Sequence, residues 1–233
     1  YDGFSKFYDK STGTYTGGDK YDSVSYNELS PKIAFDFKAD DSTNYFASYG
    51  HSFNPPGLYM LYRSTTYTGD YGTNSPPTFA NPNLDPETSD TFEIGMKKKV
   101  NDKTDLGITL YYVKTDDKIT SVPYSKTEEY PKGYKLNENV DKGKHYGIEL
   151  EVTHKFDENW DAYFNYAWQQ AKDTDGKTSV EETDYNVPKH LLHAGVSYTK
   201  DKFNGILECQ YVSERQAPEA VTGEYESQDA FFI

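Results

Sequence analysis

The sequence predicts an all-β fold, a transmembrane antiparallel up-and-down β-barrel to which this chain contributes part of the strands. Three observations support this prediction. Polar and apolar residues alternate along several segments, and short and long polar connections alternate between those segments. Aromatic residues are also abundant in a chain of low overall hydrophobicity.

The composition combines many aromatic residues with few apolar residues overall. The 233 residues include 23 tyrosines and 13 phenylalanines, although only 35% of the residues are hydrophobic. Disordered chains carry few aromatic residues, and a soluble domain normally contains a larger apolar fraction. A membrane barrel reconciles these values, because only alternate residues face lipid while aromatic side chains gather at the two membrane interfaces.

Several other classes of protein do not fit this composition. No apolar run reaches the roughly 18 residues that a transmembrane helix requires. The net charge of −14 argues against a nucleic-acid partner. The single cysteine, Cys209, excludes an internal disulfide framework and a thiolate metal site. Residues 1–4 lack a basic start, so we expect no signal peptide and a chain that begins within a structural element.

The clearest alternation covers residues 145–153, and residues 160–169 repeat it. A helix would spread these apolar residues around its circumference, so the pattern predicts a strand of about nine residues in each segment. Trp160 and Trp168 would then be interface anchors. Noisier alternation predicts six more strands, near 29–38, 44–53, 88–100, 105–116, 189–200 and 203–213.

The period of two divides the side chains of these strands between two faces. We expect a polar set to line the lumen: Glu149, Glu151, Asp161, Asn165, Glu208 and Gln210. We expect the opposite set to face outward: Tyr146, Ile148, Leu150, Phe164, Tyr166, Leu207 and Tyr211. A register error of one residue would exchange the two sets, which makes the assignment sharply testable.

The connections between these segments alternate in length. We expect short turns at 40–43, 101–104, 157–159 and 201–202, and long connections at 54–87, 117–144, 173–188 and 214–226. Outer-membrane barrels have short periplasmic turns and long extracellular loops, whereas a soluble propeller or sandwich has no reason for this segregation. Partial strands near 1–8 and 227–233 suggest that the barrel continues beyond this chain, because lipid does not tolerate unpaired sheet edges.

Several blocks of residues occur in an order and spacing found in one family. The most specific block consists of Asn81, Pro82, Asn83, Leu84, Pro86 and Glu87, followed by the Phe-Glu-Ile-Gly of residues 92–95. Before it lie Ser-Pro-Lys at 30–32 and Tyr-Gly-His-Ser-Phe-Asn-Pro-Pro at 49–56. Over essentially the whole chain these features resemble the TonB-dependent receptor family. Asn54 departs from the arginine that is common at this place in the family.

The resemblance implies an outer-membrane barrel of about 22 strands with a plugged lumen. Residues 1–233 would supply about eight complete strands of this one barrel domain, and the plug domain would lie elsewhere. It further implies an importer in the outer membrane of a diderm bacterium that takes up a small-molecule iron chelate, above all a ferric siderophore. The TonB complex would supply energy through an N-terminal region that this chain lacks. One alternative is a haem or cobalamin receptor. The other is a non-transport acidic surface or adhesive β-protein of the cell envelope.

The connection at 54–87 would lie among the extracellular loops and could meet the ligand first. Its aromatic side chains offer contact area, and its arginine offers a fork for carboxylate or phenolate oxygens. The candidate contacts are Tyr59, Tyr62, Arg63, Tyr67 and Tyr71. Alternatively, these tyrosines pack the loop against its neighbours. Haem receptors of the family carry a box similar to Asn81–Leu84 and place a ligand histidine before it, but residues 57–80 contain no histidine. The same block also occurs in siderophore receptors.

We expect no enzymatic activity, no cofactor and no resident metal. Glu149 and Glu151 would lie about 7 Å apart, near the separation in an inverting glycosidase, but they belong to the general polar pattern of the lumen. His190 and His193 are three residues apart on a strand and should point to opposite faces. Residues 173–182 nearly match a calcium loop, but Ala171 occupies the first ligand position and the flanks are strands.

Overall fold

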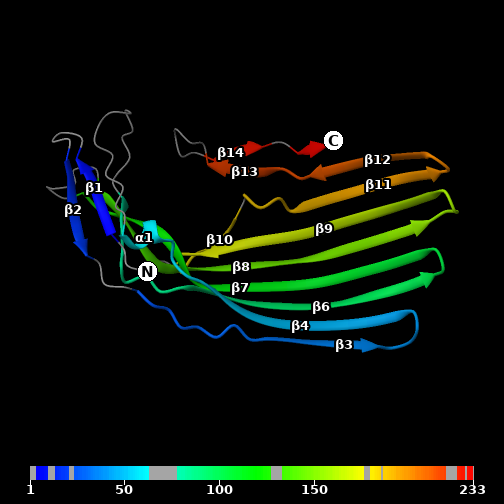
Figure 1. Cartoon of the computed structure of the whole chain (residues 1–233), viewed down its shortest axis with the longest axis horizontal. Coiled ribbons are helices and arrows are strands. Elements are labelled where there is room, and N and C mark those ends of the chain that lie inside the picture. Colours follow the sequence, from blue (N-terminus) through cyan, green and yellow to red (C-terminus); the bar gives the residue numbers. More distant parts are fainter. Residues whose placement is uncertain are drawn as a thin grey trace.

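Eight long strands form one antiparallel sheet in the computed structural model of the chain (Figure 1). The structure describes residues 4–9, 14–20, 24–62, 78–126, 133–175, 179–184, 186–218, 225–228 and 230–232. Along the sheet, each long strand pairs with the long strands before and after it in the chain, which confirms the up-and-down topology. The eight strands are β3 (Lys32–Lys38), β4 (Thr43–Asn54), β6 (Glu87–Asn101), β7 (Thr104–Tyr124), β8 (Tyr134–Lys155), β9 (Trp160–Thr174), β11 (His190–Lys200) and β12 (Phe203–Val212).

Short elements accompany this sheet. β15 (Phe231–Phe232) extends it beyond β12, β10 (Glu181–Thr183) pairs with β9, and β5 (Thr78–Phe79) makes a short parallel pairing with β8. The partial strand expected near 1–8 is β1 (Phe4–Asp9), but it pairs with β2 (Thr14–Lys20) in a separate sheet, as β13 (Arg215–Pro218) does with β14 (Tyr225–Gln228). In the described part of the chain α1 (Leu58–Tyr62) is the only α-helix, and none is long and apolar enough to cross a membrane.

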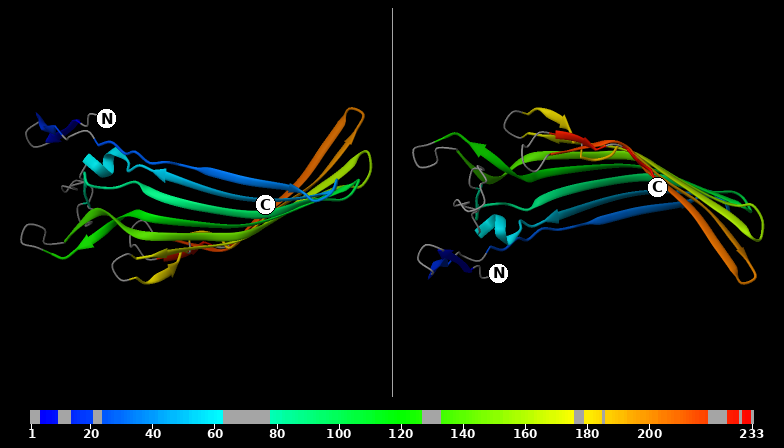
Figure 2. Two further views of the ribbon diagram at one scale, coloured as in Figure 1. Left: turned by 90° about the horizontal axis from the view of Figure 1, so that it is seen from below. Right: turned by 90° about the horizontal axis from the view of Figure 1, so that it is seen from above.

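The two ends of the large sheet differ in how the strands are joined. The turns β3–β4, β6–β7, β8–β9 and β11–β12 all lie at one end, at the right of Figure 1, and the long connections lie at the other. Seen edge-on, the sheet is twisted, so that the blue and orange strands run in different directions (Figure 2). The expected alternation of short and long connections is therefore confirmed.

Three of the four short turns are closed by a side chain at their start. The carboxylates of Asp40 and Asp157 and the amide oxygen of Asn101 each accept the backbone N–H two residues later, at 2.7–2.9 Å. Such bonds are the reason why Asp and Asn favour turns. Hydrogen bonds from the hydroxyl and N–H of Ser42 lower the pKa of Asp40, and backbone N–H groups lower that of Asp157. In the fourth turn Asp201 adopts a left-handed φ of 53°.

The register sorts the side chains of the large sheet onto two faces. One row crosses all eight strands with apolar residues, and the next row crosses them with mostly polar residues. The apolar row is Phe37, Tyr45, Met96, Ile108, Leu150, Tyr166, Leu192 and Tyr211. The polar row is Lys38, Asn44, Lys97, Gly107, Glu151, Asn165, His193 and Gln210. We call the two surfaces the apolar face and the polar face.

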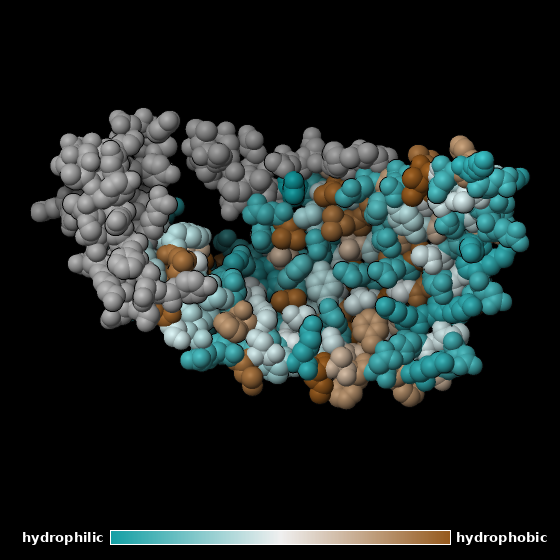
Figure 3. Space-filling model, viewed as in Figure 1, coloured by the Kyte–Doolittle hydropathy of each residue, from teal (hydrophilic) through white to brown (hydrophobic). Residues whose placement is uncertain are grey.

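The apolar face is widely exposed in the chain by itself. Leu207 is 77% exposed, Phe35 66%, Ile94 59% and Leu110 50%. Figure 3 shows that hydrophilic residues dominate the end that carries the short turns, with hydrophobic residues farther along the strands. An exposed apolar surface that continues over eight strands requires lipid or an apolar partner to cover it.

The strands β7 and β8 run much farther than the sequence predicted. A long connection was expected at 117–144, yet β7 continues to Tyr124 and β8 begins at Tyr134. Apolar residues are sparse in residues 116–142, and the short alternation of Tyr134, Leu136 and Val140 with polar residues was missed by the sequence reasoning. Backbone pairing continues nevertheless through a bulge between Thr115 and Lys118 up to the pair Tyr124–Tyr134. This part of the hairpin lies past the apolar face, and its Val122 is buried, at 6% exposed.

Three glycines on the polar face lie directly under aromatic rings of the neighbouring strand. Gly95 pairs with Phe46, Gly147 with Tyr111, and Gly195 with Tyr163. A Cβ atom at Gly95 would lie 2.3 Å from the Phe46 ring and 2.6 Å from the carbonyl oxygen of Ile108. Such pairs let an aromatic side chain cover the backbone of a curved sheet.

We therefore predict that Gly95→Ala destabilises the sheet of the full-length protein by about 1–3 kcal/mol, the usual cost of overpacking. Gly50→Ala is the matched control, because a Cβ there would meet only the Lys32 side chain, at 3.5 Å. The stability of both variants can be measured by urea unfolding in detergent, with the difference in gel mobility between heated and unheated protein as the signal for the folded state. Equal stability of the two variants would contradict the role given to the ring.

Candidate functional site

The polar face brings together the six residues expected to line a lumen. Glu151 pairs with Asn165, while Glu149 lies two residues earlier on the same strand. The register places the other members of the set on this face as well, opposite Gly195, His193 and Ser197: Glu208, Gln210 and Asp161. The seven residues expected to face outward share the opposite face by the same register: Tyr146, Ile148, Leu150, Phe164, Tyr166, Leu207 and Tyr211.

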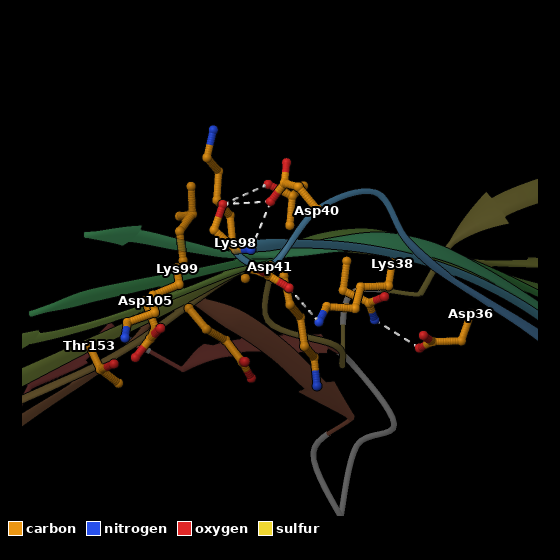
Figure 4. Close-up of a pocket in the computed structure, with 15 residues that line it drawn as sticks. Asp36, Lys38, Asp40, Asp41, Lys98, Lys99, Asp105 and Thr153 are labelled. Carbon is orange, nitrogen blue, oxygen red and sulfur yellow. Dashed lines mark hydrogen bonds and ion pairs between the residues drawn. The ribbon is translucent and has the colours of Figure 1, made fainter. Parts of the chain in front are cut away.

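Two hollows open on the polar face. One of about 340 Å³ is lined by Glu149, Glu151, Asn165, His193 and Gln210, among others. The other, of about 540 Å³, lies near the short turns and is lined by charges of both signs (Figure 4). In it Lys38 donates to Asp41 at 2.9 Å, and Asn44 donates to Asp36 at 2.8 Å. These hollows are polar surfaces that suit water or polar groups of a partner.

Tyrosine and histidine side chains connect neighbouring strands across the polar face. The hydroxyl of Tyr163 donates to Glu208 at 2.5 Å and lies 3.0 Å from Nε2 of His193. Farther along, Tyr111, His145 and Gln169 form a second group with contacts of 3.1–3.3 Å. The sequence did not single these groups out, because their members come close only through the strand register.

The two histidines of β11 point to opposite faces, as expected. His193 belongs to the group on the polar face, whereas His190 lies 2.8 Å from the hydroxyl of Tyr166 on the apolar face. They cannot hold one metal ion together. Among the described residues no three His, Cys, Asp or Glu side chains converge as metal ligands. Asp173, from the segment that resembles a calcium loop, is paired with Lys118 at 2.6 Å.

The family motif forms the buried centre of the long-connection end. Leu84 is 2% exposed and packs with Leu61 and Tyr62 of α1, which are 3% and 6% exposed. We call these three residues the motif core. Partly buried side chains surround it from the segment before β3, from α1 and from β7: Val24, Met60 and Ile119. The motif thus joins parts of the chain that are far apart in sequence.

The polar atoms of the motif secure the same arrangement. Asn81 donates to the carbonyl oxygen of Asn137 on β8 at 2.9 Å. The backbone of Asp85 exchanges two hydrogen bonds with the side chain of Asn139, at 2.9 and 2.8 Å. A carboxylate oxygen of Glu87 accepts the backbone N–H of Ile119 on β7 at 2.8 Å. The motif therefore fixes the long connection onto the β7–β8 hairpin.

Other members of the motif shape its backbone. Pro82 and Asn83 form a turn in which the N–H of Asn83 donates to the side chain of Asn81 at 3.0 Å. Pro86 is buried and immediately precedes Glu87, the first residue of β6. Proline restricts φ, so it fixes the direction in which the chain enters the strand.

The candidate ligand contacts of this connection have different positions. Tyr59 lies on the outer side of α1 and is 60% exposed, so its ring is available to a ligand. Tyr62 is buried in the motif core, which gives it a packing role in place of the expected surface contact. Arg63, Tyr67 and Tyr71 lie outside the described residues.

A further aromatic group at this end was missed by the sequence reasoning. Tyr124 and Tyr134 stack with ring centroids 5.0 Å apart, and Phe79 of β5 contacts Tyr134 edge-on at 5.6 Å. The hydroxyl of Tyr124 donates to Glu138 at 2.5 Å. The sequence signal was only a tyrosine on each side of a connection that was expected to be longer. We call Phe79, Tyr124 and Tyr134 the hairpin aromatic group.

We predict that Leu84→Ala loosens the connection between β4 and β6 by about 2–5 kcal/mol, the usual cost of truncating a buried leucine. Leu58→Ala is the control, because Leu58 is 53% exposed on the same helix. Hydrogen exchange of residues 55–86 in the full-length protein should accelerate in the first variant alone. Equal exchange in both variants would show that the motif core does not hold the connection.

Comparison with known proteins agrees with this arrangement. The family model described as "TonB dependent receptor-like, beta-barrel" matches residues 1–233. Similar solved structures include the ferric-catecholate import receptor Fiu from E. coli K12, with a TM-score of 0.67, 16% identity, and coverage of 94% of this chain and 29% of that one. A mutant of the ferric enterobactin receptor PfeA from Pseudomonas aeruginosa is similar with a TM-score of 0.68 and 16% identity, covering 87% of this chain and 31% of that one. The copper transporter OprC is similar with a TM-score of 0.62 and 19% identity, covering 87% of this chain and 29% of that one.

These identities are low, so the solved structures establish the fold alone. The chain spans about a third or less of the length of each of the three. Its strands therefore correspond to part of a larger barrel. The match of the family model over the whole chain, together with the two-faced up-and-down sheet, shows that this chain belongs to the TonB-dependent receptor β-barrel family.

Proposed function

We propose that this chain is part of an outer-membrane receptor of a diderm bacterium that imports a scarce ligand. A ferric siderophore is the first candidate for this ligand. The observation that carries the proposal is the separation of polar and apolar side chains onto two faces by a register that stays in step across eight strands, between the short turns and the bulge after Thr115. In a closed barrel these faces become a polar lumen and a surface for lipid.

The two hollows support the assignment of the polar face to the lumen. Both are lined by charged and amide side chains of that face. The alternative of a soluble or adhesive surface protein would require the apolar face to pack into a core, yet Ile94, Leu110 and Leu207 are at least half exposed. Lipid would cover these side chains without a further protein layer.

Ligand import assigns roles to the two ends of the sheet. Long connections of outer-membrane barrels lie outside the cell, so Tyr59 and the hairpin aromatic group would meet an incoming ligand together with Arg63, Tyr67 and Tyr71. Aromatic rings offer flat contact area, and a guanidinium pairs with the anionic oxygens of an iron chelate. Energy would come from the TonB complex, which would act through a region outside these residues.

The orientation of the faces can be tested with two adjacent residues of β8. Leu150 lies midway along the apolar face and Glu151 on the polar face. We predict that Leu150→Arg costs about 2–4 kcal/mol, as a charge at the bilayer midplane does, and reduces the folded barrel in the outer membrane. Glu151→Arg carries the same new side chain and should leave barrel abundance near that of the wild type. The reverse outcome would place the polar face toward lipid.

Ligand contact can be tested in cells that express the full-length receptor. We predict that the double variant Arg63→Ala, Tyr67→Ala lowers uptake of radioactive ferric siderophore about tenfold or more, because it removes a charged fork and an aromatic contact. Barrel abundance should not change. Tyr45→Ala, on the apolar face, is the control for loss of an exposed tyrosine. Unchanged ligand affinity in the double variant would assign the contact to other loops.

A further inference from the structure

A row of lysines crosses three adjacent strands at the long-connection end of the apolar face. Lys114 of β7 pairs with Lys144 of β8, which pairs with Lys172 of β9. Their side chains are 45%, 41% and 29% exposed. We call these three residues the lysine row. Like charges that lie directly opposite on neighbouring strands destabilise a sheet, so packing alone gives no reason for this arrangement.

Nearby carboxylates compensate the lysine row only in part. Glu181 of β10 accepts from both Lys144 and Lys172, at 2.6 and 2.8 Å. Asp116 lies 2.5 Å from Lys114 and 3.9 Å from Lys142, a fourth lysine of the same face. Asp90 also pairs with Lys114 across β6 and β7, so three carboxylates serve four ammonium groups. Asp90 is itself bound by Tyr49 and His51.

Glu181 is negatively charged at neutral pH. Its hydrogen bonds with Lys144 and Lys172 lower the pKa of its carboxyl to about 2. It is therefore a permanent counter-charge that any anion approaching the two lysines has to displace or share.

The position of the row relative to the aromatic residues indicates what it meets. One step toward the middle of the apolar face lies a line of rings, paired strand by strand: Tyr49, Phe92, Tyr112 and Tyr146. Tyr49 and Phe92 have centroids 5.0 Å apart, and Tyr112 and Tyr146 stack at 6.4 Å. Tyrosine rings of membrane proteins gather at the level of the lipid headgroups. The lysine row lies just beyond that level, on the side of the long connections.

We propose that the lysine row binds the phosphate group of a lipid headgroup in the outer leaflet of the membrane. This inference rests on the proposed function, because it takes the apolar face as the lipid surface. Lysine ammonium groups attract anionic headgroups within a Debye length. Three of them on adjacent strands form a line about 10 Å long, which allows one phosphorylated headgroup to contact several strands. The tyrosine rings below would contact the acyl chains and the glycerol or sugar part.

The test uses the purified full-length receptor in detergent, titrated with bisphosphorylated lipid A and followed by native mass spectrometry. The triple variant Lys114→Gln, Lys144→Gln, Lys172→Gln should bind this lipid at least about tenfold more weakly than the wild type, since each lysine near an anionic surface contributes roughly a fivefold factor. The control variant Lys32→Gln, Lys126→Gln, Lys135→Gln removes the same charge elsewhere and should bind as the wild type does. Dephosphorylated lipid should bind the wild type weakly, and excess inorganic phosphate should displace lipid A poorly.

A second variant separates lipid binding from a purely structural role of the lysines. Glu181→Gln removes the shared counter-charge, so lipid A should bind this variant severalfold more tightly than the wild type. If the lysines served only to hold β10, this variant would loosen residues 179–184 without any gain in lipid binding. Equal binding of lipid A by the wild type and the triple variant, or of phosphorylated and dephosphorylated lipid by the wild type, would overturn the proposal. Failure of the proposed function is detected separately. If the polar face turned toward lipid, Glu151→Arg and not Leu150→Arg would reduce the folded barrel.

Discussion

The strand register is the constraint on which the rest of this structure depends. A shift of one residue between two strands would move every side chain of one of them to the other face. In lipid that shift would place carboxylates such as Glu149 and Glu151 in the hydrocarbon region, so the alternative pairings are strongly disfavoured. The register also creates the groups that no single strand contains, including the lysine row and the contacts of Tyr163 with His193 and Glu208.

The two ends of the sheet are stabilised by different physics. At the short-turn end, backbone pairing between strands holds the sheet together, and few of the described side chains there are buried. At the long-connection end, the motif core and the hydrogen bonds of Asn81, Asp85 and Glu87 provide a small but conventional buried core. This core gives α1 and residues 78–86 a defined position beside the hairpin of β7 and β8.

The two-faced part of the sheet could be predicted from the sequence because its polar and apolar residues alternate locally. Residues 145–153 and 160–169 alternate so regularly that each residue reveals its face, and the short turns begin with Asp or Asn. The extension of β7 to Tyr124 could not be predicted in this way, because its apolar residues Ile119 and Val122 are three residues apart and do not alternate. The burial of Tyr62 depends on contacts between segments far apart in sequence, and the line formed by Lys114, Lys144 and Lys172 depends on the strand register. No local pattern encodes either.

The side-chain closure of the short turns has a consequence for how such a barrel can change. Asp40, Asn101 and Asp157 satisfy their turns with atoms from the turn itself, so each hairpin is complete without help from the opposite end. Its register is set at this end and carried along the paired backbones. Residues inserted into or removed from a long connection then cost little closure entropy and leave the pairing untouched. The fold therefore tolerates the exchange of whole long connections, while the paired strands that carry them keep their register.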